Sequence, residues 1–448
     1  MTILSKHKFT LAFLLVGGQV FGQQELMLHQ SPAHIWHRNT INPAIFPSEK
    51  RFAIGLPGLA LDQQHSGDLS IQDFIREDGD QKYIDLGQVI GKLDPENTFD
   101  LDQRIETVLL GARFGKWAVH LGHAIRYSGS VTYPKSLAEL LWYGNGPYIG
   151  QTLNIAPAFN IFGWNELGVG VSREIGKVRI GARAKYLAGI GAIESDADHH
   201  KATIYTNPDI YQLQLETDYA FRSAAFVNAI DTAGFGYDFQ TEDLGNGKIF
   251  SKNSGLAFDL GFTAGIGERL TISGSLLDLG GKIKWTENAS RFHSNGSWEY
   301  AGVEILGADL ISGADSIRID NQLDSLNDIF QFQKTAEEFS SEIPTRMYLG
   351  ASFKVTERWT VGGVFFQQRG TARDLMSFGA NAQFTPTKWL TAGAMYSLND
   401  RSAANIGLNV GLRVGPAHVY FTSDNVLNAV RGDASPALNF RAGAGIVF

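Results

Sequence analysis

Few residues of this 448-residue chain combine the types and spacing that catalysis requires. His120 and His123 lie on one expected strand, but their odd spacing places them on opposite faces of that strand. The sequence contains no Gly-x-Ser-x-Gly motif, the usual setting of a serine nucleophile. We therefore predict no catalytic residue, no cofactor and no enzymatic activity.

One short cluster has residue types that bind metals. Asp196, Asp198, His199 and His200 fall in an expected loop, and imidazole and carboxylate groups are common ligands of transition metals. An acidic, solvated loop with two adjacent histidines gives the same pattern and is the more frequent case. We therefore expect no metal site from this cluster.

Basic residues recur on one face of several alternating segments. If the apolar faces of these segments point to lipid, the opposite face carries Arg113, Arg179, Arg183, Lys185, Lys354, Arg413 and Arg441 into a lumen. A ring of cations favours anions in a pore. The alternative, which we favour, is that these cations pair with Asp259 and with a plugging helix over 320–340, whose acids are Asp320, Asp324, Asp328, Glu337 and Glu338.

The segments themselves alternate with a period of two. Leu256, Phe258 and Leu260 alternate with small or polar residues through residue 266, and the same pattern covers 178–186, 376–384 and 404–414. Runs of about ten residues match tilted strands that cross the hydrocarbon layer. Strands of soluble sandwiches are shorter, about 5–6 residues. The fold class is therefore all-β, a closed antiparallel transmembrane β-barrel.

The barrel is expected to occupy residues 51–448. Eighteen strand-like runs occur there, and single-chain barrels usually have an even number of strands, so we predict about 14, within a range of 12–16. Short helical insertions are expected near 134–143 and 320–340. Residues 62–103 are acidic and loop-like, with a short helix at 71–77 or 85–92.

Turn positions do not reveal the orientation of the barrel. Tight turns expected at Gly163 and Gly176 would bracket one strand and so lie on opposite sides of the membrane.

Four tryptophans each follow an expected turn, where aromatic rings suit the membrane–water interface. They are Trp117, Trp164, Trp359 and Trp389.

The beginning of the chain predicts export. Lys6 and Lys8 precede a short apolar run at 11–16, and compact residues follow at 20–22, so residues 1–22 read as a signal peptide. A polar N-terminal arm is expected over 23–50.

The composition excludes some kinds of site and partner. The absence of cysteine excludes disulfides and a lipidated cysteine. A net charge of −8 argues against nucleic acid as a partner.

The last strand supports a location in the outer membrane. Leu438, Phe440 and Phe448 belong to an alternating strand that ends on phenylalanine. This strand resembles the signal that the bacterial outer-membrane assembly machinery recognises. The expected partners are outer-membrane lipid and that machinery during biogenesis, and an envelope protein is a further candidate.

Several motifs in order along the chain carry a family resemblance. Asn42-Pro43-Ala44 lies within NTINPAIFP, RFAIGLPGL follows at 51–59, and related segments occur at 133–155, 166–193 and 270–285. Together they resemble an uncharacterised Bacteroidota outer-membrane family. It is similar in build to long-chain fatty-acid transporter barrels and to barrel subunits of the type IX secretion system. The resemblance implies a barrel and its compartment but no activity.

Two function classes follow from the sequence. One is a passive channel or uptake barrel for a small hydrophobic or anionic solute. The other is a non-conducting interaction barrel, accessory to secretion, motility or envelope assembly.

Overall fold

The computed structural model describes most of the chain. The described residues are 25–32, 34–47, 50–66, 69, 71–78, 81–225, 229–231, 234–236, 250–300, 330–370, 374–399, 405–426 and 438–448. The expected signal peptide over 1–22 lies outside them.

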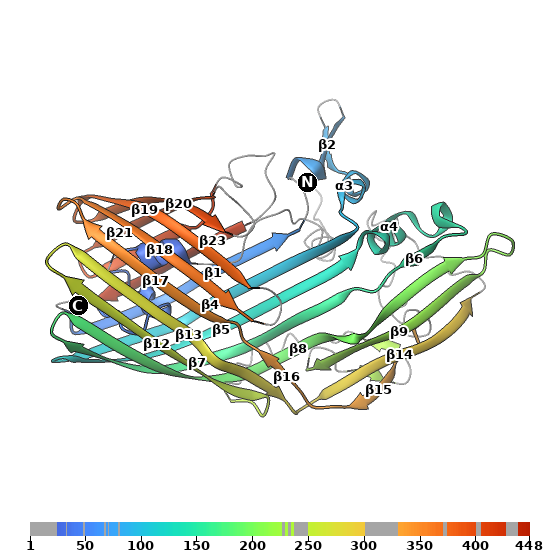
Figure 1. Ribbon diagram of the computed structural model, residues 1–448, viewed down its shortest axis with the longest axis horizontal. Coiled ribbons are helices and arrows are strands. Elements are labelled where there is room, and N and C mark those ends of the chain that lie inside the picture. The colour runs from blue at the N-terminus through green and yellow to red at the C-terminus, as the bar shows by residue number, and fades with distance from the viewer. Residues whose placement is uncertain are drawn as a thin grey trace.

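Fourteen antiparallel strands close into a barrel, and Figure 1 shows how they are arranged. In chain order they are β1 (Phe52–His65), β4 (Glu96–Phe114), β5 (Trp117–Pro134), β7 (Ala158–Ile175), β8 (Val178–Thr206), β12 (Ser254–Ile266), β13 (Leu270–Trp285), β17 (Thr345–Lys354), β18 (Trp359–Arg369), β19 (Leu375–Thr387), β20 (Leu390–Asn399), β21 (Asn405–Val414), β22 (Ala417–Ser423) and β23 (Leu438–Val447). The barrel closes where β23 pairs with β1, from Ala53 opposite Val447 to Gln63 opposite Leu438. The predicted fold class and strand number are confirmed.

Apolar side chains cover the outside of the barrel. On β12, Leu256, Phe258 and Leu260 are about half exposed, whereas the intervening Ala257 and Asp259 are fully buried. The same alternation continues around the wall through Val169, Val171, Ile180, Phe378, Leu408, Val410 and Phe421. A continuous apolar outer band of this kind is typical of a barrel that faces lipid.

Six short turns join strand pairs at one end of the barrel. They occupy residues 115–116, 176–177, 267–269, 355–358, 388–389 and 415–416. Four contain a glycine with positive φ, a conformation that other residues adopt at a cost. The half-exposed rings of Trp117, Trp359 and Trp389 stand beside these turns, as in an aromatic girdle.

The expected turn at Gly163 is wrong. Gly163 lies inside β7, opposite Tyr127 of β5 and Gly191 of β8, and the register shifts between it and Trp164. The Tyr127 ring packs where a side chain at residue 163 would stand. Trp164 is buried beneath the Arg126 guanidinium, 4.8 Å from the ring centre, and so is not part of a girdle.

A sheet extension projects from the end of the barrel opposite the short turns (Figure 1). The second half of β8 leaves the barrel and pairs with β9 (Leu213–Ala224), which pairs with β14 (Ala289–Tyr300). One face of this sheet buries Leu215, Phe221 and Phe292. Shorter elements border it, namely α4 (Lys135–Tyr143), η3 (Gly146–Tyr148), β6 (Thr152–Asn154), β15 (Gln333–Ala336) and β16 (Phe339–Glu342). Helix α4 occupies the insertion expected over 134–143.

The helix expected over 320–340 is wrong over its last third. Residues 320–329 lie outside the described residues, but β15 and β16 occupy 333–336 and 339–342. Both strands pair with free sheet edges, β15 with β14 and β16 with β13, and this pairing overrides the helical spacing. Glu338 contacts Lys284 at 2.6 Å on the surface of the molecule, with both side chains more than half exposed.

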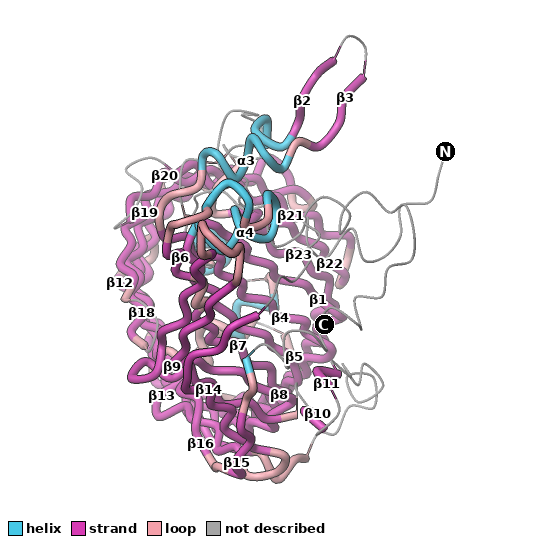
Figure 2. Tube along the Cα trace, turned by 90° about the vertical axis from the view of Figure 1, so that its right-hand side faces the viewer, coloured by secondary structure: helices cyan, strands magenta, loops and turns pink. Residues whose placement is uncertain are grey.

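Small elements cap the same end of the barrel, above β1 and β4. They are η2 (Ile71–Phe74), the hairpin of β2 (Ile75–Asp78) and β3 (Gln81–Ile84), and helix α3 (Leu86–Lys92). Figure 2 shows this hairpin standing clear of the barrel beyond α3. Strands β1 and β4 reach into the region expected to be a loop, while α3 matches the helix expected at 85–92.

A separate short pair is formed by β10 (Ala229–Asp231) and β11 (Gly234–Gly236). In the described part of the chain, no helix is long and apolar enough to cross a bilayer.

Candidate functional site

The N-terminal segment fills the interior of the barrel. Described residues 25–32 and 34–47, here called the plug, contain α2 (Leu26–Gln30) and the 3-10 helix η1 (Trp36–Thr40). Leu26, Met27 and Leu28 have no exposed surface and pack in one cluster with Tyr348 and Phe366 of the wall. The described plug residues of the arm expected over 23–50 therefore form an internal element.

The Asn42-Pro43-Ala44 motif anchors the plug to the wall. The Asn42 Nδ2 group donates hydrogen bonds of 3.1 Å to the carbonyl oxygens of Phe262 and Gly274, on β12 and β13. The Asn42 Oδ1 atom accepts a 2.9 Å hydrogen bond from the Ala44 backbone and so holds the turn. One side chain thus fixes both the local conformation and the position of the plug.

Glycines on the inner wall make room for the plug. A Cβ atom at Gly261 would lie 2.2 Å from Asn42 Oδ1, and one at Gly181 would lie 2.5 Å from the Pro43 carbonyl. A Cβ atom at Gly111 would lie 2.5 Å from the ring of Trp36, whose Nε1 donates to the Leu109 carbonyl at 3.0 Å. The wall and the plug are therefore complementary in shape.

Polar contacts hold the other end of the plug. The Asp424 carboxylate, in the loop after β22, accepts hydrogen bonds from the backbone N–H groups of Leu26 at 3.0 Å and Met27 at 2.8 Å. The Gln30 Nε2 group donates to the carbonyl of Gly363 at 2.9 Å. Hydrogen bonds therefore fix both ends of the plug, in addition to its apolar packing against the wall.

A network of buried ion pairs lies beside the plug. Lys185 is at its centre, with its Nζ atom 2.6 Å from Asp278, 2.9 Å from Asp259 and 3.7 Å from Glu166. The other buried members, on the wall and at the start of the plug, are Arg104, Arg126, Arg183, Arg346, Arg441, Glu25 and Glu106. With six cations against five carboxylates, the charges of this network nearly balance.

Several network members also contact the plug. Arg183 donates to the carbonyl of Thr40 at 3.2 Å and to Asn39 Oδ1 at 2.8 Å. Arg441 donates to Thr40 Oγ1 at 2.9 Å and pairs with Glu25 of the plug. The same charges therefore brace the wall and seat the plug.

Asp278 has an unusual backbone at the centre of this network. Its φ of 58° lies in the left-handed region, where aspartate is tolerated better than most residues. Its N–H group donates to Asp259 Oδ1 at 2.9 Å, and its carboxylate contacts Arg346 at 2.7 Å and Arg126 at 3.3 Å. Strain of this kind persists only where surrounding contacts over-determine it.

The seven basic residues expected in the lumen fall into two groups. Arg183, Lys185 and Arg441 are buried in the network, and Arg183 and Lys185 contact Asp259, the partner expected from the sequence. The rest lie near the short turns: Arg113 and Arg179 both contact Glu174, Lys354 lies 2.8 Å from Glu357, and Arg413 donates to the Gly415 carbonyl at 3.2 Å.

The histidines and the expected assembly strand are also placed. His120 points inward to Arg183 at 3.3 Å, whereas His123 contacts the Thr107 hydroxyl at 2.7 Å, so they do not share a site. Leu438 begins β23, the Phe440 ring stacks on Phe421, and the half-exposed Phe448 donates its N–H to the Phe52 carbonyl. Recognition of this strand by assembly machinery stays a prediction.

The sequence did not point to three of the six cations of the network, nor to four of its five acids. Arg104 and Glu106 were hidden because the register of β4 shifts between Glu106 and Val108, which reverses the alternation before Arg113. Glu25 lies in a segment without a period. Allowing the inward face to change from odd to even residue numbers within this strand would have found Arg104 and Glu106.

A small pocket lies inside the barrel beside the plug, and the outer wall has a groove. A pocket of about 20 Å³ beside Thr40 and Arg104 holds no more than one water. On the outer wall, a groove of about 400 Å³ crosses β5, β7, β8 and β12. It exists because β8 presents the small Ala182 and Ala184 to the outside, between Val169 and Leu260 of the neighbouring strands.

Solved barrels resemble this fold at low sequence identity. The toluene transporter TbuX of Ralstonia pickettii matches with a TM-score of 0.45 and 12% identity, over 97% of this chain and 100% of that chain. The toluene transporter TodX of Pseudomonas putida matches with 0.42 and 10%, over 96% and 94%. The translocator domain of the autotransporter NalP from Neisseria meningitidis matches with 0.31 and 7%, over 90% of each chain.

No curated protein matches the sequence. A family of unknown function, DUF5723, matches residues 43–424, from the Asn-Pro-Ala turn of the plug to the aspartate that holds α2. The expected membership of an uncharacterised family is confirmed: the chain belongs to the DUF5723 family.

Proposed function

We propose that this protein is an outer-membrane barrel for passive uptake of small apolar solutes, closed at rest by its own plug. The observation that carries the proposal is the plug itself, which fills the barrel and is anchored by reversible polar contacts such as Asn42 to Phe262 and Asp424 to Met27. A segment held in this way can shift without a covalent bond being broken. Short turns face the periplasm in outer-membrane barrels, so the sheet extension would stand outside the cell.

The groove on the outer wall supports an apolar solute. Its volume falls within the range of small-molecule sites, and its walls are the apolar side chains of Val119, Val169 and Phe258. Buried Arg183 and Asp259, which lie beside the plug, also border it. Sideways passage between the lumen and the membrane here requires the plug to move and the pairing of β8 with β7 and β12, which is continuous across the groove, to open locally. Toluene, which the TbuX and TodX barrels transport, is one solute of this class.

Solute uptake by cells that produce the protein tests this proposal. Ala182→Phe fills the groove and should abolish toluene uptake. Ala380→Phe, at an exposed alanine of β19 away from the groove, should leave uptake unchanged. Equal uptake by both variants would contradict passage through the groove.

A non-conducting interaction barrel is the second candidate, and the sheet extension favours it. That sheet projects beyond the barrel, and its polar face carries Lys201 and Glu216 with side chains more than half exposed. In a planar bilayer, the closed state predicts silence for the wild-type chain and conductance after residues 25–47 are deleted. Silence of both, together with no solute uptake, would favour the interaction barrel.

A further inference from the structure

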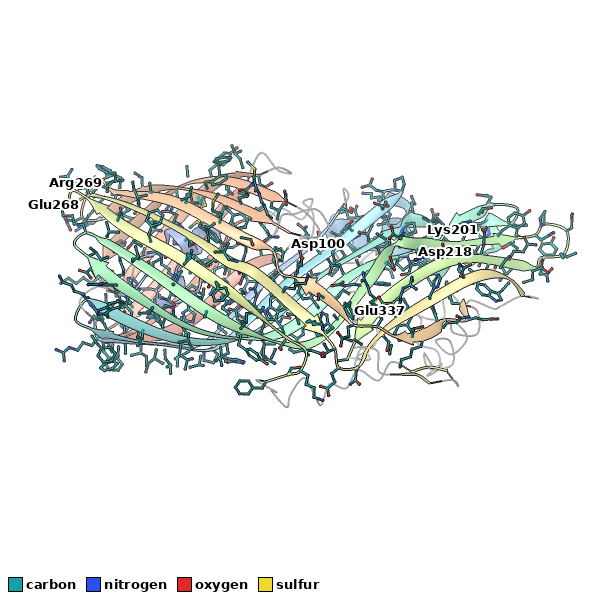
Figure 3. The ribbon with its side chains drawn as sticks, turned by 60° about the horizontal axis from the view of Figure 1, so that its bottom comes forward. Asp100, Lys201, Asp218, Glu268, Arg269 and Glu337 are labelled. Carbon is teal, nitrogen blue, oxygen red and sulfur yellow. The ribbon has the colours of Figure 1, made fainter. Side chains whose placement is uncertain are left out.

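A cluster of three potential metal ligands lies on the sheet extension, away from the plug. His199 of β8, Asp218 of β9 and His293 of β14 share the polar face of the sheet. His199 Nδ1 and His293 Nε2 lie 2.7 and 3.0 Å from the same Asp218 oxygen, and the three atoms are within 4.8 Å of one another. Figure 3 shows Asp218 beside Lys201 in the extension, at the opposite end of the molecule from Glu268 and Arg269.

Strand register brings these side chains together. Asp218 pairs directly with Lys201 on one side and Asn295 on the other. His199 and His293 each stand two residues from those partners, so their rings reach Asp218 diagonally. The register of β8 shifts between Ser195 and His200, and such bulges re-aim side chains next to functional sites.

The surroundings leave the three ligands available. Two cations of the same strands are already paired, Lys201 with Glu216 and Arg291 with Asp196 at 3.2 Å. The three ligand side chains are 27–40% exposed, so an ion from solution can reach them. The opposite face of the same strands is packed in an apolar cluster, which holds the three backbones in place.

We propose that His199, Asp218 and His293 bind a divalent transition-metal ion such as Zn²⁺. Two imidazoles and one carboxylate are an established ligand set for zinc and iron. Ligand distances of about 2.0–2.1 Å in a tetrahedral site put ligand atoms roughly 3.4 Å apart, so the side chains need to move by less than about 1 Å. The ion cross-links three strands and keeps a position open for water or an added ligand.

Zinc titration of the purified, detergent-solubilised full chain without a polyhistidine tag tests the site. We expect one ion per chain by calorimetry, with affinity lowered at least about tenfold by Asp218→Asn or His293→Gln. His200→Gln is the matched control, because His200 neighbours His199 but packs its ring against Tyr219. This variant should bind zinc as the wild type does.

Two outcomes would overturn the metal site. One is unchanged zinc affinity in a double variant carrying Asp218→Asn and His293→Gln. The other is a wild-type chain that binds no zinc. Circular dichroism checks that each variant is folded, and absorption of bound Co²⁺ gives a second measurement that depends on ligand identity. Neither result depends on solute uptake, so this site can fail independently of the proposed function.

Discussion

Lys185 is the most heavily paired cation of the interior. It is fully buried and contacts three carboxylates, so Lys185→Met would leave Asp259 and Asp278 without their nearest cation. Removing one partner of a buried ion pair costs about 3–5 kcal/mol, because the remaining charges stay buried. We expect a loss of this size in the free energy of unfolding, measured by urea titration in lipid vesicles with tryptophan fluorescence.

Lys354→Met is the matched control for that substitution. Lys354 contacts Glu357 at 2.8 Å, but its side chain is 45% exposed at the end of β17, beside a short turn. Exposed pairs contribute about 0–1 kcal/mol, so this variant should unfold close to the wild type. Equal losses from the two substitutions would show that the buried network has no special role in stability.

Asp424 makes the seating of the plug depend on pH. Burial raises the pKa of its carboxyl to about 6, although hydrogen bonds from Met27 and Leu26 oppose the shift. Withdrawal of the plug, as proposed above, would expose the carboxyl to water, where its ordinary pKa is 3.8. Because the seated state has the higher pKa, protonation favours it. Seating should therefore strengthen as pH falls from above 6 toward 4 and stay constant above that window.

Hydrogen exchange of residues 25–32 measures this effect. After correction for intrinsic rates, protection should be greater at pH 5 than at pH 7.5. Asp424→Asn keeps a hydrogen-bond acceptor without a charge, so its protection should not change between the two pH values. A pH response that persists in this variant would assign the effect to another group.

At the residue scale, the sequence predicts which face of a strand a side chain lies on better than it predicts which residues that side chain contacts. Lys185 and Asp259 were placed on the inner face because regular alternation carries them there. Arg104 and Glu106 escaped because a register shift in β4 breaks that alternation. His199 and Asp218 meet only through pairing of strands, which sequence spacing does not contain.

Among the elements, the plug depends on small residues of the wall. Gly261→Ala would put a Cβ atom 2.2 Å from Asn42 Oδ1, so the plug must shift. Gly265→Ala, on the same strand, meets nothing nearer than 3.8 Å. We expect faster tryptic cleavage after Arg38 in Gly261→Ala only. Equal cleavage of both variants would mean that the plug does not rest on β12.

Elements differ in how far the sequence predicts them. Barrel strands were predictable because the bilayer imposes apolar residues at every second position over about ten residues. The plug was not, because α2 has only five residues and is held by groups distant in sequence, the Asp424 carboxylate and the Gly363 carbonyl. The spacing over 320–340 indicated a helix, yet residues 333–336 and 339–342 pair with sheet edges that local pattern cannot reveal.

The whole molecule divides its surface between lipid and water. Apolar side chains face outward along the barrel, whereas the extension keeps its apolar residues on one packed face and its polar residues on the other. This change along β8 marks where the strand leaves the apolar band. It also separates the two proposed sites, with the plug and groove in the barrel and the metal ligands on the extension.

Substituting arginine at exposed positions should distinguish the surface in lipid from the surface in water, because the loss of folding free energy differs between them. Leu260, about half exposed in the middle of β12, lies in the apolar band, and Leu260→Arg should lose about 2–4 kcal/mol of folding free energy in vesicles. Ile210 is 64% exposed in the turn between β8 and β9, and Ile210→Arg should cost about 0–1 kcal/mol, because that turn is in water. Urea titration in vesicles measures both. A large cost at Ile210 would place the extension in lipid, and a negligible cost at Leu260 would remove the barrel wall from the membrane.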